Sequence, residues 1–160
     1  MTASVDQVRE WIIGLLPRLR RFARTITRNH DDADDLVQIA VERALQRYEQ
    51  WRPDSRFESW MFGIVRNAWI DEVRARQRRN RVLAPEEEGE HVGGGTGESQ
   101  AEALSIHAAM AALPEEQRMA VALVLIEGLS YKEAAEALVI PIGTLTSRLA
   151  RGREALQALL

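Results

Sequence analysis

Apolar residues recur at intervals of three and four through most of the chain, which is the period of an amphipathic α-helix. Met119–Ile126 is almost wholly apolar and predicts the centre of a small C-terminal bundle. The other predicted helices are Val5–Thr27, one from His30 to about Trp51, Trp60–Arg81 with Ser59 as its cap, and Ala101–Leu113. The predicted fold class is therefore all-α.

Proline and glycine punctuate this pattern. Pro17 lies inside the first predicted helix and predicts a kink or a break there, because proline supplies no backbone N–H. Pro114 suits the first position of a further helix, and Gly128 suits the residue just beyond its end.

The last thirty residues predict two helices that meet at a tight turn. Ser130 and Glu133 form the pattern of a capping box at the start of the first helix, and the second begins at Pro141. Small hydroxyls and two guanidiniums fall on one stripe of the second helix, and such groups contact phosphates and base edges in DNA-recognition helices. They are Thr144, Ser147, Arg148 and Arg151. The alternative is a solvated amphipathic helix in a bundle.

Residues 84–100 are rich in glutamate and glycine and predict a flexible acidic linker. The chain then divides into two small helical domains, residues 1–83 and 101–160. Seventeen linker residues reach at most ~60 Å when fully extended.

Charge is unevenly distributed about a net −3, with the basic excess before residue 86 and the acidic excess after it. The chain has no cysteine, which excludes disulfides and thiolate metal sites. Four aspartates, at 31, 32, 34 and 35, lack the pattern of a calcium loop and suit the first turn of a helix. We therefore expect no metal, no cofactor and no catalytic residue. Without a long apolar run or a signal-peptide pattern, a cytoplasmic protein is expected.

Five arginines end the third predicted helix, within the eight residues 74–81. They suit the negative end of the helix dipole. Their closeness to Asn67 and Trp69 also suits a surface that binds a nucleic-acid strand by stacking and amide contacts.

In combination, several motifs resemble the group-four, extracytoplasmic-function sigma factors of bacterial RNA polymerase. The resemblance covers residues 10–81 and 101–160. It depends on the segments 32–38 (DADDLVQ), 57–67 (FESWMFGIVRN), 113–118 (LPEEQR), 128–135 (GLSYKEAA) and 141–149 (PIGTLTSRL).

The resemblance implies a promoter-specificity subunit that binds core RNA polymerase, reads minus-10 and minus-35 promoter DNA and helps to open the duplex, under the control of an anti-sigma factor. Residues 1–83 would be sigma region 2 and residues 101–160 sigma region 4. The implied polymerase contacts are Asp34, Asp35, Leu36 and Gln38. The implied minus-10 contacts are Arg52, Asp54, Ser55, Arg56, Arg66, Asn67, Trp69, Asp71 and Arg74. The implied minus-35 contacts are Lys132, Gly143, Thr144, Ser147, Arg148 and Arg151.

Three positions depart from the family pattern. Ile39 stands where an acid is usual, which bears on polymerase docking. Val139 replaces a usual glycine and predicts a strained or altered turn, because glycine is common where φ is positive. Thr146 replaces a usual basic residue and removes one phosphate contact.

Two other classes of function remain open at this stage. A sigma mimic would keep the fold and only titrate a regulator, and the changes at Val139 and Thr146 leave room for it. A nuclease would act through the aspartates, but no acid pair has a histidine or lysine at convincing spacing.

Overall fold

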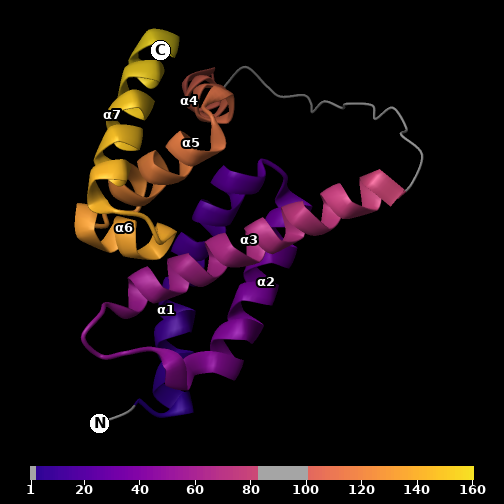
Figure 1. Ribbon diagram of the computed structural model, residues 1–160, viewed down its shortest axis with the longest axis vertical. Helices are drawn as coiled ribbons and strands as arrows, with labels where there is room; N and C mark the ends of the chain where they lie inside the picture. Colours follow the sequence, from indigo (N-terminus) through magenta and orange to yellow (C-terminus); the bar gives the residue numbers. More distant parts are fainter. Residues whose placement is uncertain (1–2, 83–100) are drawn as a thin grey trace.

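The structure is a computed structural model that describes residues 3–82 and 101–160, and every regular element in these ranges is helical (Figure 1). This confirms the all-α prediction. The linker prediction, residues 84–100, lies outside the described residues. The elements are α1 (Val5–Thr27), α2 (His30–Arg47), the 3-10 turn η1 (Tyr48–Gln50), α3 (Phe57–Val82), α4 (Ala101–Ala112), α5 (Glu115–Val121), the π-helical turn η3 (Ala122–Ile126), α6 (Tyr131–Leu138) and α7 (Ile142–Leu159).

Helices α1, α2 and α3 form the N-terminal unit, residues 3–82. Its centre holds Phe22 and Phe62, both fully buried, whose rings meet edge to face with centroids 5.4 Å apart. Helix α1 has the predicted bounds and continues through Pro17 without a break. Ile13, whose carbonyl lacks the N–H that residue 17 would otherwise supply, lies on the exposed side of the helix.

The start of α3 corrects one prediction. The helix begins at Phe57, and Ser59 does not cap it: this serine is 3 % exposed and its hydroxyl has no hydrogen-bond partner. Phe57 contacts Trp11, Trp51 and Trp60, with ring centroids 5.2–5.6 Å apart. We attribute the earlier start to this aromatic packing, which holds Phe57 against α1.

Helices α4 to α7 form the C-terminal unit, residues 101–160. Arg118 is only 4 % exposed and donates from Nε to the Met110 carbonyl (3.1 Å) and from Nη2 to the Leu113 carbonyl (2.9 Å). It thereby satisfies acceptors at the end of α4 that the helix itself leaves without donors. Pro114 is the N-cap of α5, with ψ 148°, and not its first helical residue as predicted.

The predicted apolar helix Met119–Ile126 changes its winding. Its last five residues form the π-helical turn η3, and Leu125 and Ile126 are 45 % and 39 % exposed, so the segment is not buried throughout. Gly128 follows with φ 79°, the left-handed conformation expected of a residue just past a helix end.

Helices α6 and α7 form the predicted helix-turn-helix pair. The Ser130–Glu133 capping box is present, with hydrogen bonds of 3.0 and 2.9 Å. The turn places Val139 at φ 57° and ψ 50°, which confirms the predicted strain. Pro141 is the N-cap of α7, one residue before the predicted first helical position. The predicted apolar face is buried only in the middle of α7: Leu145, Leu149 and Gly152 are buried, Leu156 is half-buried, and Ile142 and Leu159 are exposed.

Val139→Gly is expected to stabilise the C-terminal unit by about 1 kcal/mol. A β-branched residue in the left-handed region is strained by roughly 1–2 kcal/mol, and glycine removes that strain at some expense of unfolded-state entropy. Because Val139 is 71 % exposed, little burial is lost. Urea unfolding followed by circular dichroism measures the gain. Val139→Ala should show none of it, since alanine keeps the Cβ; an equal gain from alanine would contradict the strain.

The two units pack against each other along α3 and α6 (Figure 1). Gly63 lies in the middle of α3, and a Cβ added there would come within 3.1 Å of the Ala137 carbonyl oxygen of α6. Among the described residues, no helix has the length and apolar character needed to span a membrane.

Candidate polymerase and nucleic-acid interfaces

A loop before α3 holds four of the residues predicted to contact minus-10 DNA. Arg52, Asp54 and Arg56 are exposed. The backbone N–H of Ser55 donates to the Arg52 carbonyl at 3.0 Å, and Trp51 Nε1 donates to the Ser55 carbonyl at 3.1 Å, so the loop is a fixed turn. Its shape therefore does not depend on a bound ligand.

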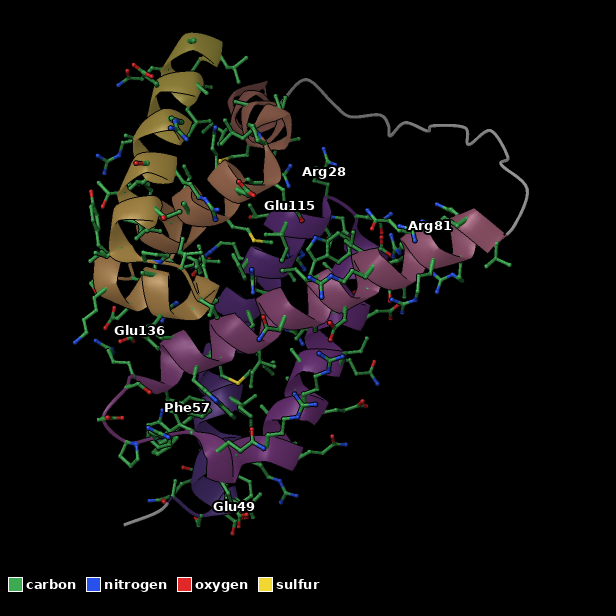
Figure 2. All side chains as sticks on the ribbon, viewed as in Figure 1. Arg28, Glu49, Phe57, Arg81, Glu115 and Glu136 are labelled. Carbon is green, nitrogen blue, oxygen red and sulfur yellow. The ribbon has the colours of Figure 1, made fainter. Side chains whose placement is uncertain are left out.

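Beside this turn lies an aromatic hollow, which the sequence analysis did not predict. Trp11 of α1, Trp51 and Phe57 line it together with Arg56, and Figure 2 labels Phe57 at this end of α3. The missing signal was long-range: Trp11 is far from Trp51 in sequence, and its 39 % exposure gives no hint that its ring contacts two other aromatic rings.

The middle of α3 presents polar side chains next to that turn. Asn67 is exposed, and its Oδ1 accepts a hydrogen bond of 2.9 Å from Arg66. Arg74 is exposed, whereas Asp71 forms an ion pair of 2.9 Å with Arg43 of α2. Asn67 and Arg74 are therefore accessible to a ligand as the chain stands.

Trp69 is placed differently from the exposed stacking residue that the sequence suggests. It is 8 % exposed, and its Nε1 donates to Glu115 Oε2 of α5 at 2.8 Å. The guanidinium of Arg76 lies over its ring, 5.5 Å from the centroid. In this arrangement Trp69 cannot stack on a base.

The arginine cluster at the end of α3 is likewise only partly free. Arg76 pairs with Asp32 (3.0 Å) and Glu72 (2.9 Å), and hydrogen bonds to these two carboxylates raise its pKa. Arg79 lies 3.6 Å from Glu72. Arg78 and Arg81 are exposed, and Figure 2 shows Arg81 near the far end of α3. The surface predicted from five arginines is thus reduced by internal ion pairs.

The predicted minus-35 residues lie mostly on the outer side of the helix-turn-helix pair. Lys132, Gly143, Ser147 and Arg151 are exposed and Thr144 is half-buried. The side chain of Arg148 is 25 % exposed, and its Nη2 lies 3.6 Å from Glu116 of α5. Thr146, the departure from the family pattern, donates its hydroxyl to the Ile142 carbonyl at 2.9 Å. Its hydrogen is therefore satisfied within its own helix.

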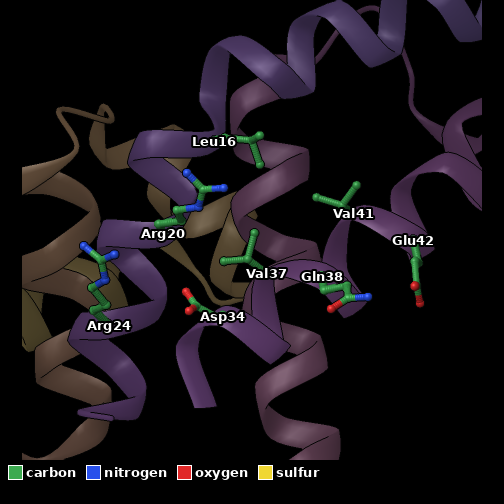
Figure 3. Close-up of a pocket in the computed structure, with 8 residues that line it drawn as sticks. All are labelled: Leu16, Arg20, Arg24, Asp34, Val37, Gln38, Val41 and Glu42. Atoms are coloured by element: carbon green, nitrogen blue, oxygen red, sulfur yellow. The ribbon is translucent and has the colours of Figure 1, made fainter. Parts of the chain in front are cut away.

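A groove of about 520 Å³ runs between α1 and α2 and contains two of the predicted polymerase contacts, Asp34 and Gln38 (Figure 3). Arg20 and Arg24 of α1 face them from the other side, and the sequence analysis had treated these arginines mainly as a solvated surface. Asp35 is also exposed. Leu36 is 2 % exposed and belongs to the core, so it supports this surface without being part of it.

Burial and like charge act together on Arg66. Burial is the main cause that lowers its pKa, followed by repulsion from Arg148 of α7 and from Arg74, while Glu115 opposes the shift. The charge of one predicted minus-35 residue is therefore felt at a predicted minus-10 residue.

The acids at the start of α2 act as helix-end residues. Asn29, which the sequence analysis overlooked, is the N-cap, and its side chain accepts from the Asp32 N–H at 3.0 Å. Within residues 3–82 and 101–160, no group of three potential metal-ligating side chains gathers.

Both halves of the chain match known protein families. Residues 12–79 match Sigma-70 region 2, and residues 103–156 match Sigma-70, region 4. The ECF RNA polymerase sigma factor EcfG of Rhodopseudomonas palustris is 35 % identical over 161 residues, spanning 97 % of this chain and 86 % of the relative. The ECF sigma factor SigM of Mycobacterium tuberculosis is 36 % identical over 89 % of this chain and 71 % of its own.

Among solved structures, the fold is similar to that of the sigma factor RpoE of Bartonella quintana in complex with the anti-sigma factor NepR. The TM-score is 0.78 at 30 % identity, and the match covers 96 % of both chains. Two matched regions, in the same order and together with relatives aligned over nearly the whole chain, leave one conclusion: the chain belongs to the extracytoplasmic-function sigma factors of the sigma-70 family.

Proposed function

We propose that this promoter-specificity subunit divides its work between the two units. The N-terminal unit (residues 3–82) reads the minus-10 element and docks on core polymerase, and the C-terminal unit (residues 101–160) reads the minus-35 element. The observation that carries the assignment is the polar outer stripe of α7, held at a fixed turn to α6 as in helix-turn-helix proteins. The protein itself supplies no catalytic group; polymerase makes the RNA.

Minus-10 reading is assigned to the turn Arg52–Arg56 and to the exposed face of α3, with Asn67 as the residue that contacts a base. An amide side chain can accept from and donate to a base edge at once. The aromatic hollow beside the turn offers apolar and π surface to an unstacked base, which offsets the few kcal/mol that unstacking requires. The predicted contacts Arg66, Trp69, Asp71 and Arg74 complete this surface once their partners within the chain are released.

Minus-35 reading is assigned to α7 and to Lys132 of α6. Arg148 is the side chain with the geometry to contact guanine, because a guanidinium can bond O6 and N7 together. The remaining residues, Gly143, Thr144, Ser147 and Arg151, lie around it on the same side and would contact phosphates or neighbouring bases.

Core polymerase is assigned to the groove between α1 and α2. Asp34 and Gln38 on one side and Arg20 and Arg24 on the other give it both signs of charge, which suits a partner helix that also carries both. The exposed Ile39, 37 % accessible, adds an apolar contact where an acid is usual in the family.

We further propose regulation by an anti-sigma factor and action in the cytoplasm, where polymerase works. The matched Bartonella quintana sigma factor is in complex with an anti-sigma factor, and its fold agrees with this chain over both units. A pull-down from the source cells should therefore recover polymerase subunits together with a small regulatory protein.

Run-off transcription tests the assignment. Core polymerase from the source bacterium is combined with this protein and a library of linear genomic fragments, and promoter-dependent transcripts are sequenced at their 5′ ends. Start sites that share two upstream elements are expected only when the protein is present. A protein that binds core polymerase but yields no such transcripts from any fragment would instead be a mimic that titrates a regulator.

A further inference from the structure

We propose that the free chain is held closed by a latch between its two units, centred on Glu127, and that opening this latch is a step in binding core polymerase. The inference rests on the proposed function for what the open chain does. The closed arrangement itself depends only on the contacts between the two units.

Glu127 is a carboxylate that its own unit does not explain. It lies directly after the turn η3, at a helix C-terminus, where a negative charge opposes the helix dipole. Its side chain is only 1 % exposed, and a buried carboxylate is costly unless it is paired. The ion pairs and side-chain hydrogen bonds of Glu127 all come from the other unit.

Two arginines of α1 hold Glu127. Arg21 donates from Nε to Oε2 (2.8 Å) and from Nη2 to Oε1 (2.7 Å), the two-point geometry that gives a guanidinium its strongest carboxylate pair. Arg18 donates to Oε1 (3.2 Å) and to the Glu127 carbonyl (2.7 Å), and it also bonds Glu58. Burial lowers the pKa of Arg18, but the bonds to Glu58 and Glu127 outweigh it and raise that pKa overall.

Helix packing supports the same contact by a different kind of interaction. Gly63 lies in the interior of α3, where glycine destabilises a helix by roughly 0.5–1 kcal/mol relative to alanine. Its missing side chain is what allows the Ala137 backbone of α6 to approach so closely. Polar contacts extend along the seam: Arg56 pairs with Glu133 at 3.3 Å, and Arg28 donates to the Ala111 carbonyl at 3.1 Å.

The latch uses residues that promoter reading needs. Two consecutive glutamates at the start of α5 bond both reading surfaces: Glu115 accepts from Trp69, and Glu116 pairs with Arg148. The minus-10 and minus-35 surfaces therefore lie side by side in the closed chain. Elements about 25 base pairs apart are roughly 85 Å apart along B-DNA, at 34–36 Å per turn. The closed chain cannot reach both, so the units must separate on the promoter.

Separation has a thermodynamic consequence for polymerase. If core polymerase holds the units apart, its apparent affinity is reduced by the fraction of chains that are open. A change that weakens the latch should therefore raise the open fraction and the affinity for core polymerase by the same factor. Glu127→Gln removes the charge and keeps the size, and we expect a factor of about ten to a hundred for a buried two-point pair.

Interdomain distance and polymerase affinity together test the latch. The chain has no cysteine, so Gln46→Cys on α2 and Gln157→Cys on α7, both exposed, accept a fluorescent donor and acceptor without side reaction. Transfer efficiency is measured in the free chain and during titration with core polymerase. Wild type should show high efficiency that falls as polymerase binds, whereas Glu127→Gln should start low and bind polymerase about ten- to a hundredfold more tightly.

Two further variants make the result decisive. Glu154→Gln, which removes one charge from the exposed surface of α7, should behave as wild type. Gly63→Leu should open the chain by steric wedging, and leucine is a good helix former, so α3 is expected to stay folded. Circular dichroism verifies that each variant is helical.

The outcomes separate the latch from the proposed function. Equal, low transfer in free wild type and Glu127→Gln would overturn the latch. So would an opened Glu127→Gln variant whose polymerase affinity is unchanged, or a wild-type chain that stays closed while bound. If no variant binds polymerase, the proposed function fails, and the free-chain distances still decide whether the latch exists.

Discussion

Arg118→Ala is expected to destabilise the C-terminal unit by about 3–5 kcal/mol, enough to unfold a small domain of ordinary stability. The guanidinium bonds two carbonyls at the end of α4 from a position that is 4 % exposed. Removing it leaves two buried acceptors unsatisfied, at about 1–3 kcal/mol each, and leaves a cavity where the side chain was. Burial lowers the pKa of Arg118, with a further lowering by Arg28, so no paired charge offsets this loss.

The distribution of tryptophan lets one urea titration locate the damage. All four tryptophans, at positions 11, 51, 60 and 69, are in the N-terminal unit. Circular dichroism should therefore show an early loss of helix in Arg118→Ala, while tryptophan fluorescence keeps most of the wild-type midpoint. Arg153→Ala, at an exposed position of α7, is the matched control and should leave both signals unchanged. Coincident early transitions in both signals would mean that the two units do not unfold separately.

The helices were predictable because their determinants are local. The three-and-four spacing of apolar residues sets α1 with its observed bounds, and the Ser130–Glu133 box sets the start of α6. The misplaced start of α3 has a non-local origin. Phe57 joins that helix because it packs on Trp11, which is 46 positions earlier in the chain, and no local rule weighs such a contact against a good capping serine.

The candidate sites divide in the same way. The helical stripe of α7 and the exposed Asn67 follow from periodicity, since a helical face is fixed by spacing alone. The placement of Trp69 against Glu115 and of Glu127 between two arginines follows from how the units dock. Docking depends on shape complementarity between surfaces such as Gly63 and Ala137, and single-sequence periodicity contains no information on it.

Asn67→Ala and Arg148→Ala are expected to weaken transcription through different promoter elements. Each side chain is assigned one base-specific contact, and losing such a contact reduces discrimination by about 1–3 kcal/mol, or roughly tenfold to a hundredfold. On a promoter identified by the run-off experiment, both variants should therefore give much less transcript than wild type. That reduction alone does not assign either residue to an element.

Promoter mutations make the assignment. If Asn67 reads the minus-10 element, a minus-10 mutation should have little further effect on Asn67→Ala, because the contact is already lost, but its full effect on Arg148→Ala. The minus-35 mutation should show the reverse. Equal responses of both variants to both mutations would contradict the division of labour between the two units.

Matched controls exclude indirect effects in this experiment. Asn80→Ala removes the same side chain from an exposed position further along α3 and should transcribe as wild type. Glu116→Ala breaks the ion pair with Arg148 but leaves the guanidinium in place. If that pair only held α7 in position, Glu116→Ala would lower transcription as much as Arg148→Ala does. Under the proposed function it should not, since releasing Arg148 makes its guanidinium more available to guanine.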